Sequence, residues 1–138
     1  MGLTLIDAGV LIGFLDSDDV HHPAAERQLE LALDWGDEIA IPASALAESL
    51  VSPSRAGRSA VARVLEYVAR LPLHVEDLDT ETAVIAAALR ERHGRALPLP
   101  DALVVATAIR LNADVLLTTD RRWPAAEGLG LPGGLTVI

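Results

Sequence analysis

Residues 100–120, PDALVVATAIRLNADVLLTTD, are the most informative stretch of this sequence about its architecture. Residues 100–113 are apolar on nearly every side of a helical wheel, which predicts a buried helix. Residues 114–120 carry a short apolar run that ends in Thr-Thr-Asp, as expected of a strand buried inside a sheet. A buried helix that leads directly into a buried strand is typical of parallel sheets, whose crossovers run through helices.

The rest of the chain continues this alternation of strands and helices. The predicted strands are residues 3–7, 38–42, 73–78 and 114–120, with 135–138 as a last edge strand. The predicted helices are residues 8–15, 22–35, 44–51, 59–71, 79–94 and 100–113. Residues 52–57, SPSRAG, are predicted to form a turn because Ser, Pro and Gly are concentrated there.

Strands that alternate with helices favour parallel pairing, with helices packed on both faces of the sheet. No linker, repeat or low-complexity segment interrupts the alternation. We therefore predict a single domain over residues 1–138, of the α/β class, built as a three-layer α/β/α sandwich around a central parallel sheet.

Composition narrows the function classes. The chain has 138 residues, of which 51% are hydrophobic, so it can bury a substantial core without disulfides. Cysteine is absent, which excludes thiolate metal sites and fits the reducing cytoplasm. The longest apolar runs are too short to span a bilayer. These features predict a soluble cytoplasmic protein with no membrane partner.

The net charge of −9 argues against a protein that holds nucleic acid mainly by broad phosphate neutralisation. Any nucleic acid must therefore be bound locally. All 11 basic residues are Arg, which is explained more simply by GC-rich codon usage than by selection for phosphate contacts.

Acidic residues follow the predicted strands at positions that a parallel sheet brings together. Asp7 ends the first strand and Asp120 ends the strand at 114–120. Asp101 opens the helix before that strand, and Glu48 lies in the helix after the second strand. Ligands of open parallel sheets bind beyond the carboxyl ends of the strands, so we expect these side chains at the ligand-binding edge.

Each of these acids also has a simpler explanation. Asp101 is suited to capping its helix, Asp7 and Asp120 are suited to turns, and Glu48 is suited to an exposed helix face. If the four acids lie together, however, their carboxylates repel one another unless a cation is bound, so such a cluster favours a cation site. Divalent ions with oxygen ligands activate water and stabilise phosphate charge, the two requirements of phosphodiester cleavage.

Three parts of the sequence resemble a known family. Residues 5–19 (LIDAGVLIGFLDSDD), Glu48 and residues 100–123 (PDALVVATAIRLNADVLLTTDRRW) are similar to PIN domains, and within them to the VapC toxins of type II toxin–antitoxin modules. The resemblance implies a PIN-like fold and an endoribonuclease that uses Mg²⁺ or Mn²⁺. It also implies four catalytic, metal-binding acids, namely Asp7, Glu48, Asp101 and Asp120.

The resemblance further implies an RNA substrate, a cognate VapB-like antitoxin, a homodimer and a toxin–antitoxin hetero-oligomer. Thr118 or Thr119 is expected to supply a hydroxyl to the site. Arg121 and Arg122 are expected either to clamp phosphate or to neutralise the acidic edge.

The sequence departs from the family pattern at two positions. Gly9 stands where many relatives carry Ser or Asn, so a side-chain donor is missing near the first acid. Trp123 and Pro124 follow Arg122, where many relatives have a polar residue and then Phe.

Two other functions were weighed. Aspartyl-phosphate enzymes and receiver domains also place an acid at the end of the first strand, but they contact phosphate with a Lys, and this chain has none. An inactive PIN-like domain that serves as a binding partner or scaffold is the remaining alternative.

Overall fold

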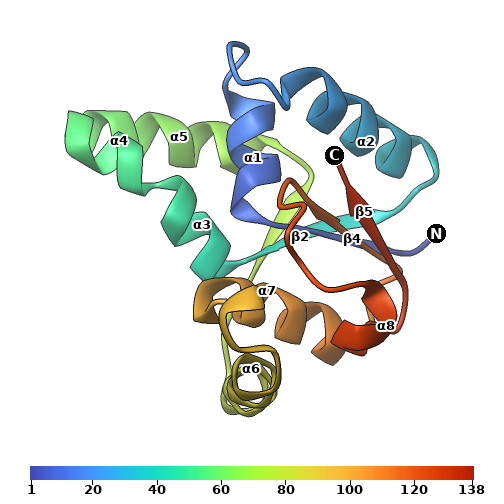
Figure 1. Ribbon diagram of the computed structural model, residues 1–138. Helices are drawn as coiled ribbons and strands as arrows, with labels where there is room; N and C mark the ends of the chain where they lie inside the picture. The colour runs from blue at the N-terminus through green and yellow to red at the C-terminus, as the bar shows by residue number, and fades with distance from the viewer.

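The computed structural model describes residues 1–138 and contains a five-stranded parallel sheet (Figure 1). The strands are β1 (Leu3–Ile6), β2 (Glu38–Pro42), β3 (Leu73–Glu76), β4 (Val115–Thr118) and β5 (Gly134–Val137). Their order across the sheet is β3-β2-β1-β4-β5, and every neighbouring pair is parallel. The predicted parallel sheet, including its last edge strand, is therefore confirmed.

Helices cover both faces of this sheet. They are α1 (Ala8–Leu15), α2 (His22–Asp34), α3 (Ala43–Ser49), α4 (Val51–Ala56), α5 (Arg58–Arg70), α6 (Thr80–His93), α7 (Leu99–Arg110) and α8 (Ala126–Leu129). A 3₁₀ turn over Gly94–Ala96 joins α6 to α7. Figure 1 shows α1 and α2 on one side of the strands and α6 and α7 on the other, which confirms the three-layer α/β/α arrangement.

The prediction of a turn over residues 52–57 is wrong, because most of this segment forms α4. Pro53 is the third residue of that helix. A proline is tolerated there because the first N–H groups of a helix have no partner within it. Gly57 then ends the helix at φ 120°, a conformation that side chains other than glycine rarely adopt.

The core lies between the central strands and the helices α1 and α7. Six of the residues of α7 are buried, Ala102, Val104, Val105, Ala106, Thr107 and Ala108, as predicted for a helix that is apolar all round. In β1 and β4 the side chains of Leu5, Ile6, Leu116 and Leu117 are at most 2% exposed. Burying each such side chain contributes about 1.5–3 kcal/mol, so the two central strands are firmly anchored. None of the helices has the length and hydropathy needed to cross a bilayer.

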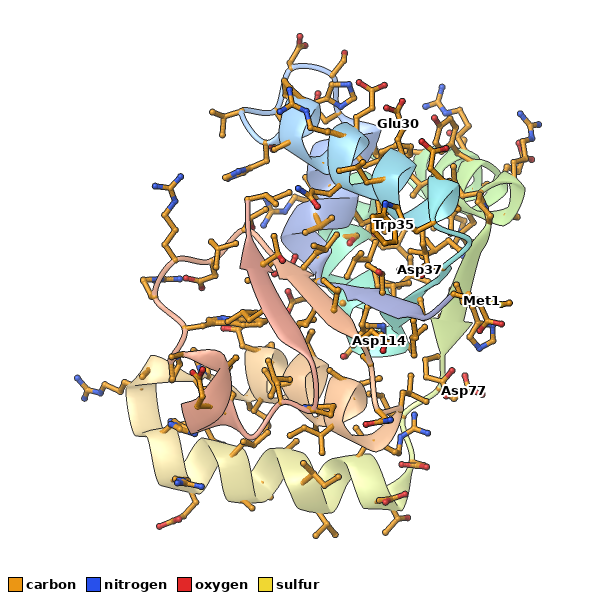
Figure 2. All side chains as sticks on the ribbon, turned by 90° about the vertical axis from the view of Figure 1, so that its right-hand side faces the viewer. Met1, Glu30, Trp35, Asp37, Asp77 and Asp114 are labelled. Carbon is orange, nitrogen blue, oxygen red and sulfur yellow. The ribbon has the colours of Figure 1, made fainter.

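Strand pairing fixes which residues meet at each edge of the sheet. Ile6 of β1 is in register with Leu117 of β4, so the residues that follow both strands emerge side by side. Figure 2 shows the opposite edge, where Asp37 and Asp114 lie near Met1. There Asp114 accepts a hydrogen bond from the backbone N–H of Leu3 at 2.7 Å. Asp114 therefore has a structural partner far from the carboxyl ends of the strands.

Candidate active site

Asp7 is held at the junction between β1 and α1. Its backbone N–H donates to the carbonyl of Leu117 at 3.2 Å, which extends the pairing of β1 with β4 by one residue. One side-chain oxygen, Oδ1, accepts the backbone N–H of Val10 at 2.9 Å and so caps α1. The residue is only 7% exposed. The carboxylate is therefore both a helix cap and a fixed, buried negative charge.

The hydroxyl of Thr118 connects Asp7 to the loop that follows β4. Thr118 Oγ1 donates to Asp7 Oδ2 at 2.5 Å and accepts the backbone N–H of Asp120 at 3.0 Å. The side chain is completely buried, so water does not compete for these bonds. Thr118 thus ties Asp7, the first of the predicted acids, to Asp120, the last of them.

Asp120 lies two residues beyond β4 and is paired with Arg122. Asp120 Oδ1 accepts from the backbone N–H and from Nε of Arg122 at 2.9 and 3.0 Å, and Oδ2 accepts from Nη2 at 2.9 Å. The hydrogen bonds from Arg122 lower the pKa of Asp120. The Arg122 side chain is 87% exposed, whereas Asp120 is 19% exposed. Arg122 therefore neutralises the acidic edge in this structure, and Arg121 is exposed without an ion pair.

Asp101 is the third residue of α7 and is half-buried. The N-cap position of this helix is Pro98, and no side chain caps its first turn. Asp101 therefore makes no capping hydrogen bond, although its charge lies in the first turn of α7. Burial raises the pKa of Asp101, and the nearby indole Nε1 of Trp123 offsets part of that rise without reaching the geometry of a hydrogen bond.

Glu48 lies on α3, which follows β2, and it is the most exposed of the four predicted acids. Partial burial raises the pKa of Glu48, and so do the negative charges of Asp101 and Asp7. The charge of Glu48 is therefore within electrostatic reach of Asp101 and Asp7.

The charges of the four predicted acids affect one another's pKa. Burial is the main cause that raises the pKa of Asp7, Glu48 and Asp101 above the usual range. The charge of Asp120 raises the pKa of Asp7 and of Asp101 further. Like charges that raise one another's pKa lie within electrostatic reach, and Thr118 links Asp7 directly to Asp120 at the carboxyl ends of the strands.

Comparison with protein-family models matches residues 4–129 to the family described as PIN domain. The chain belongs to the PIN domain family. A comparison with curated proteins finds no significant match.

Solved structures share the PIN domain fold over nearly the whole chain. VapBC2 from Rickettsia felis, bound to a DNA fragment from its promoter, has a TM-score of 0.74 at 19% identity and covers 98% of both chains. A toxin–antitoxin complex from Klebsiella pneumoniae has a TM-score of 0.69 at 22% identity, covering 97% of this chain and 96% of the other. VapC20 from Mycobacterium tuberculosis, described as a Sarcin-Ricin loop cleaving toxin, has a TM-score of 0.64 at 17% identity and covers 82% and 86%.

A hydrated divalent cation fits the donor set of this PIN domain. No three His, Cys, Asp or Glu side chains lie close enough together to form a ready-made metal cage. Mg²⁺ keeps several of its waters and takes only one or two direct carboxylates, so it does not require such a cage. The acids also supply the hard oxygen ligands that Mg²⁺ and Mn²⁺ prefer, and a cation would relieve their mutual repulsion.

Arg95 is a residue near the acids that the sequence did not single out. It lines a small cavity of about 70 Å³ together with Asp120 and Arg122. The sequence signal was weak, because Arg95 is one Arg in the short segment before α7. A larger cavity of about 180 Å³ lies near α2 and β3, is lined mainly by apolar residues and includes none of the four acids.

Proposed function

We propose that this PIN domain is a metal-dependent endoribonuclease that acts as the toxin of a type II toxin–antitoxin module. The observation that carries the proposal is the linkage of Asp7 and Asp120 through the Thr118 hydroxyl at the ligand-binding edge of a parallel sheet, with Glu48 and Asp101 within electrostatic reach. The structural similarity to a Sarcin-Ricin loop cleaving toxin supports RNA as the substrate class. The similarity to toxin–antitoxin complexes supports the biological role and a VapB-like antitoxin partner.

Asp7, Glu48, Asp101 and Asp120 would hold Mg²⁺ or Mn²⁺. When bound, such an ion supplies an activated water and stabilises charge on the phosphate in transit. The chain's own residues provide the positioning. Val10 and Thr118 fix the Asp7 carboxylate through its two oxygens, so its direction does not depend on a ligand.

Basic side chains at the rim supply the contact with substrate. Arg95 and Arg122 line the same cavity as Asp120. Because Arg122 is largely exposed, its guanidinium is free to turn from Asp120 toward a phosphate of the RNA. Two local cations of this kind suit a protein with a strongly negative net charge, since they bind phosphate only at the site.

Metal titration of RNA cleavage tests the proposal. The purified chain is expected to cleave RNA with Mg²⁺ or Mn²⁺, to stop in excess EDTA, and to recover when the metal is restored. The reason is that the acids alone provide no activated water at neutral pH. Cleavage products are followed on denaturing gels with a labelled RNA mixture. Undiminished cleavage in EDTA contradicts the metal mechanism, and no cleavage with either metal favours the inactive binding or scaffold domain.

A VapB-like antitoxin is expected to inhibit the enzyme by placing an Arg among these carboxylates. The bidentate pairing of Arg122 with Asp120 supports this, because it demonstrates that a guanidinium is accommodated at the acidic edge. When the chain is expressed with the neighbouring reading frame, a small partner is expected to co-purify and to suppress cleavage. Substitution of the inserting Arg of that partner should restore cleavage. Harmless expression of the chain alone, with no co-purifying partner, contradicts the toxin role.

A further inference from the structure

The Thr119 side chain fills the space that a side chain at position 9 would need, at the edge of the acidic cluster. Gly9 is the second residue of α1, and its backbone has no positive φ that would require glycine. A Cβ added to Gly9 would overlap the hydroxyl oxygen of Thr119 and lie 3.1 Å from Thr119 Cβ and 3.2 Å from Cγ2. The close fit at this position is therefore set by the Thr119 side chain in its present rotamer, and not by backbone conformation.

The Thr119 hydroxyl makes no hydrogen bond within the protein, and the buried Oγ of Ser44, at the start of α3, is also without a partner. Thr118 Oγ1 is used twice, by Asp7 and by the N–H of Asp120, whereas Thr119 Oγ1 makes no such bond. Thr119 is half-buried, its backbone N–H lowers the pKa of Asp7, and its neighbour in the chain is Asp120. An unpaired hydroxyl is thus held against the first turn of α1, beside two of the acids.

We propose that Thr119 is a positioning residue of the nuclease site and that its hydroxyl stands in for the missing side chain at position 9. This inference rests on the proposed function. The hydroxyl hydrogen-bonds a water that a divalent ion retains beside Asp7, because Mg²⁺ and Mn²⁺ keep part of their water shell and a hydroxyl both donates and accepts. The Thr119 hydroxyl reaches the site from the loop after β4, whereas the side chain of a Ser or Asn at position 9 would reach it from α1.

Single variants test the hydroxyl itself. Thr119→Val keeps the shape of the side chain and removes the hydroxyl, so Mn²⁺ affinity measured by calorimetry is expected to fall about tenfold, with a similar loss of cleavage. Thr119→Ser keeps the hydroxyl and should stay within about twofold of wild type. Melting temperatures of the metal-free variants should remain close to wild type, since the hydroxyl has no partner in the protein.

Relocating the hydroxyl provides the decisive comparison. Gly9→Ser alone should lower the melting temperature because Thr119 fills the space that a Cβ at position 9 needs. In Gly9→Ser/Thr119→Ala that overlap is removed, and Mn²⁺ affinity should recover to within about threefold of wild type. Its matched control, Gly9→Ala/Thr119→Ala, has the same packing without the hydroxyl and should remain about tenfold weaker.

Equal Mn²⁺ affinity for wild type, Thr119→Val and both double variants overturns this inference alone, since Thr119 would then only fill space. A wild-type protein that neither binds Mn²⁺ nor cleaves RNA overturns the nuclease proposal together with it. A recovered affinity in the Ser-containing double variant, and not in its Ala control, supports both.

Discussion

Replacement of Asp101 by Asn is expected to reduce RNA cleavage at least about 100-fold while raising the melting temperature of the metal-free protein. Burial, followed by the charges of Asp120 and Asp7, raises the pKa of Asp101, so its ionised form is unfavourable without a cation. Asn keeps the shape, removes the charge and leaves no buried charge unpaired. We expect a rise of about 2–4 °C, modest because the residue is half-exposed.

The difference in melting temperature between Asp101→Asn and wild type should depend on pH, because the pKa of Asp101 is raised in the folded protein. A group with a raised folded pKa contributes stability below its unfolded pKa of about 4 and loses it as pH rises through the folded pKa. The melting-temperature gap between Asp101→Asn and wild type should therefore be absent near pH 3 and open toward neutral pH. Asp18→Asn is the matched control, because Asp18 is exposed in the turn between α1 and α2, and this variant should show wild-type cleavage and no such gap.

Mg²⁺ is expected to reverse the order of the two melting temperatures. A ligand that binds only the folded state raises stability in proportion to its affinity, and the intact cluster binds Mg²⁺ more tightly than the variant. Thermal melts of both proteins at neutral pH, with and without Mg²⁺, measure the reversal. If Asp101→Asn melts lower without metal and Mg²⁺ shifts both proteins equally, Asp101 has a structural role and the four-acid site is wrong.

Replacement of Thr118 by Val is expected to weaken both the fold and the catalysis. The substitution removes the donor to Asp7 and the acceptor for the N–H of Asp120. A buried polar group left without its partner costs about 1–3 kcal/mol, so the free energy of unfolding should fall by about that amount. Cleavage should fall about 10- to 100-fold because Asp7 and the Asp120 loop are no longer held together.

Two further variants separate the role of Thr118 from the general effect of burying Val. Thr118→Ser retains the hydroxyl and should keep cleavage within about threefold of wild type. Thr107→Val is the matched control, because Thr107 is also fully buried but donates only to the Leu103 carbonyl within α7. It should leave cleavage unchanged. Urea unfolding and single-turnover cleavage measure the two effects, and equal behaviour of Thr118→Val and Thr107→Val would exclude Thr118 from the site.

The sequence predicted best those features that depend on hydrogen bonds between residues close together in the chain. The helix predicted at residues 79–94 is confirmed as α6, with Asp79 as its N-cap and Gly94 as its C-cap. Such signals depend on hydrogen bonds within one turn of helix. The turn predicted at 52–57 was wrong because Pro53 lies early enough in α4 to be tolerated. The four-residue helix α8 was not predicted, since so short a segment has no measurable periodicity.

The amino-acid sequence by itself determined the strands, the main helices and the parallel α/β class, because these follow from periodicity and from the rules of parallel crossovers. It also determined the edge of the sheet at which Asp7 and Asp120 emerge, because both residues follow parallel strands. The tertiary structure alone decided that Thr118 bonds Asp7, that Arg122 pairs with Asp120 and that Thr119 fills the space beside Gly9. The physical reason is that these contacts depend on side-chain direction and on the β1–β4 register. The bond between Thr118 and Asp7 spans 111 positions of sequence and exists only once the two strands pair.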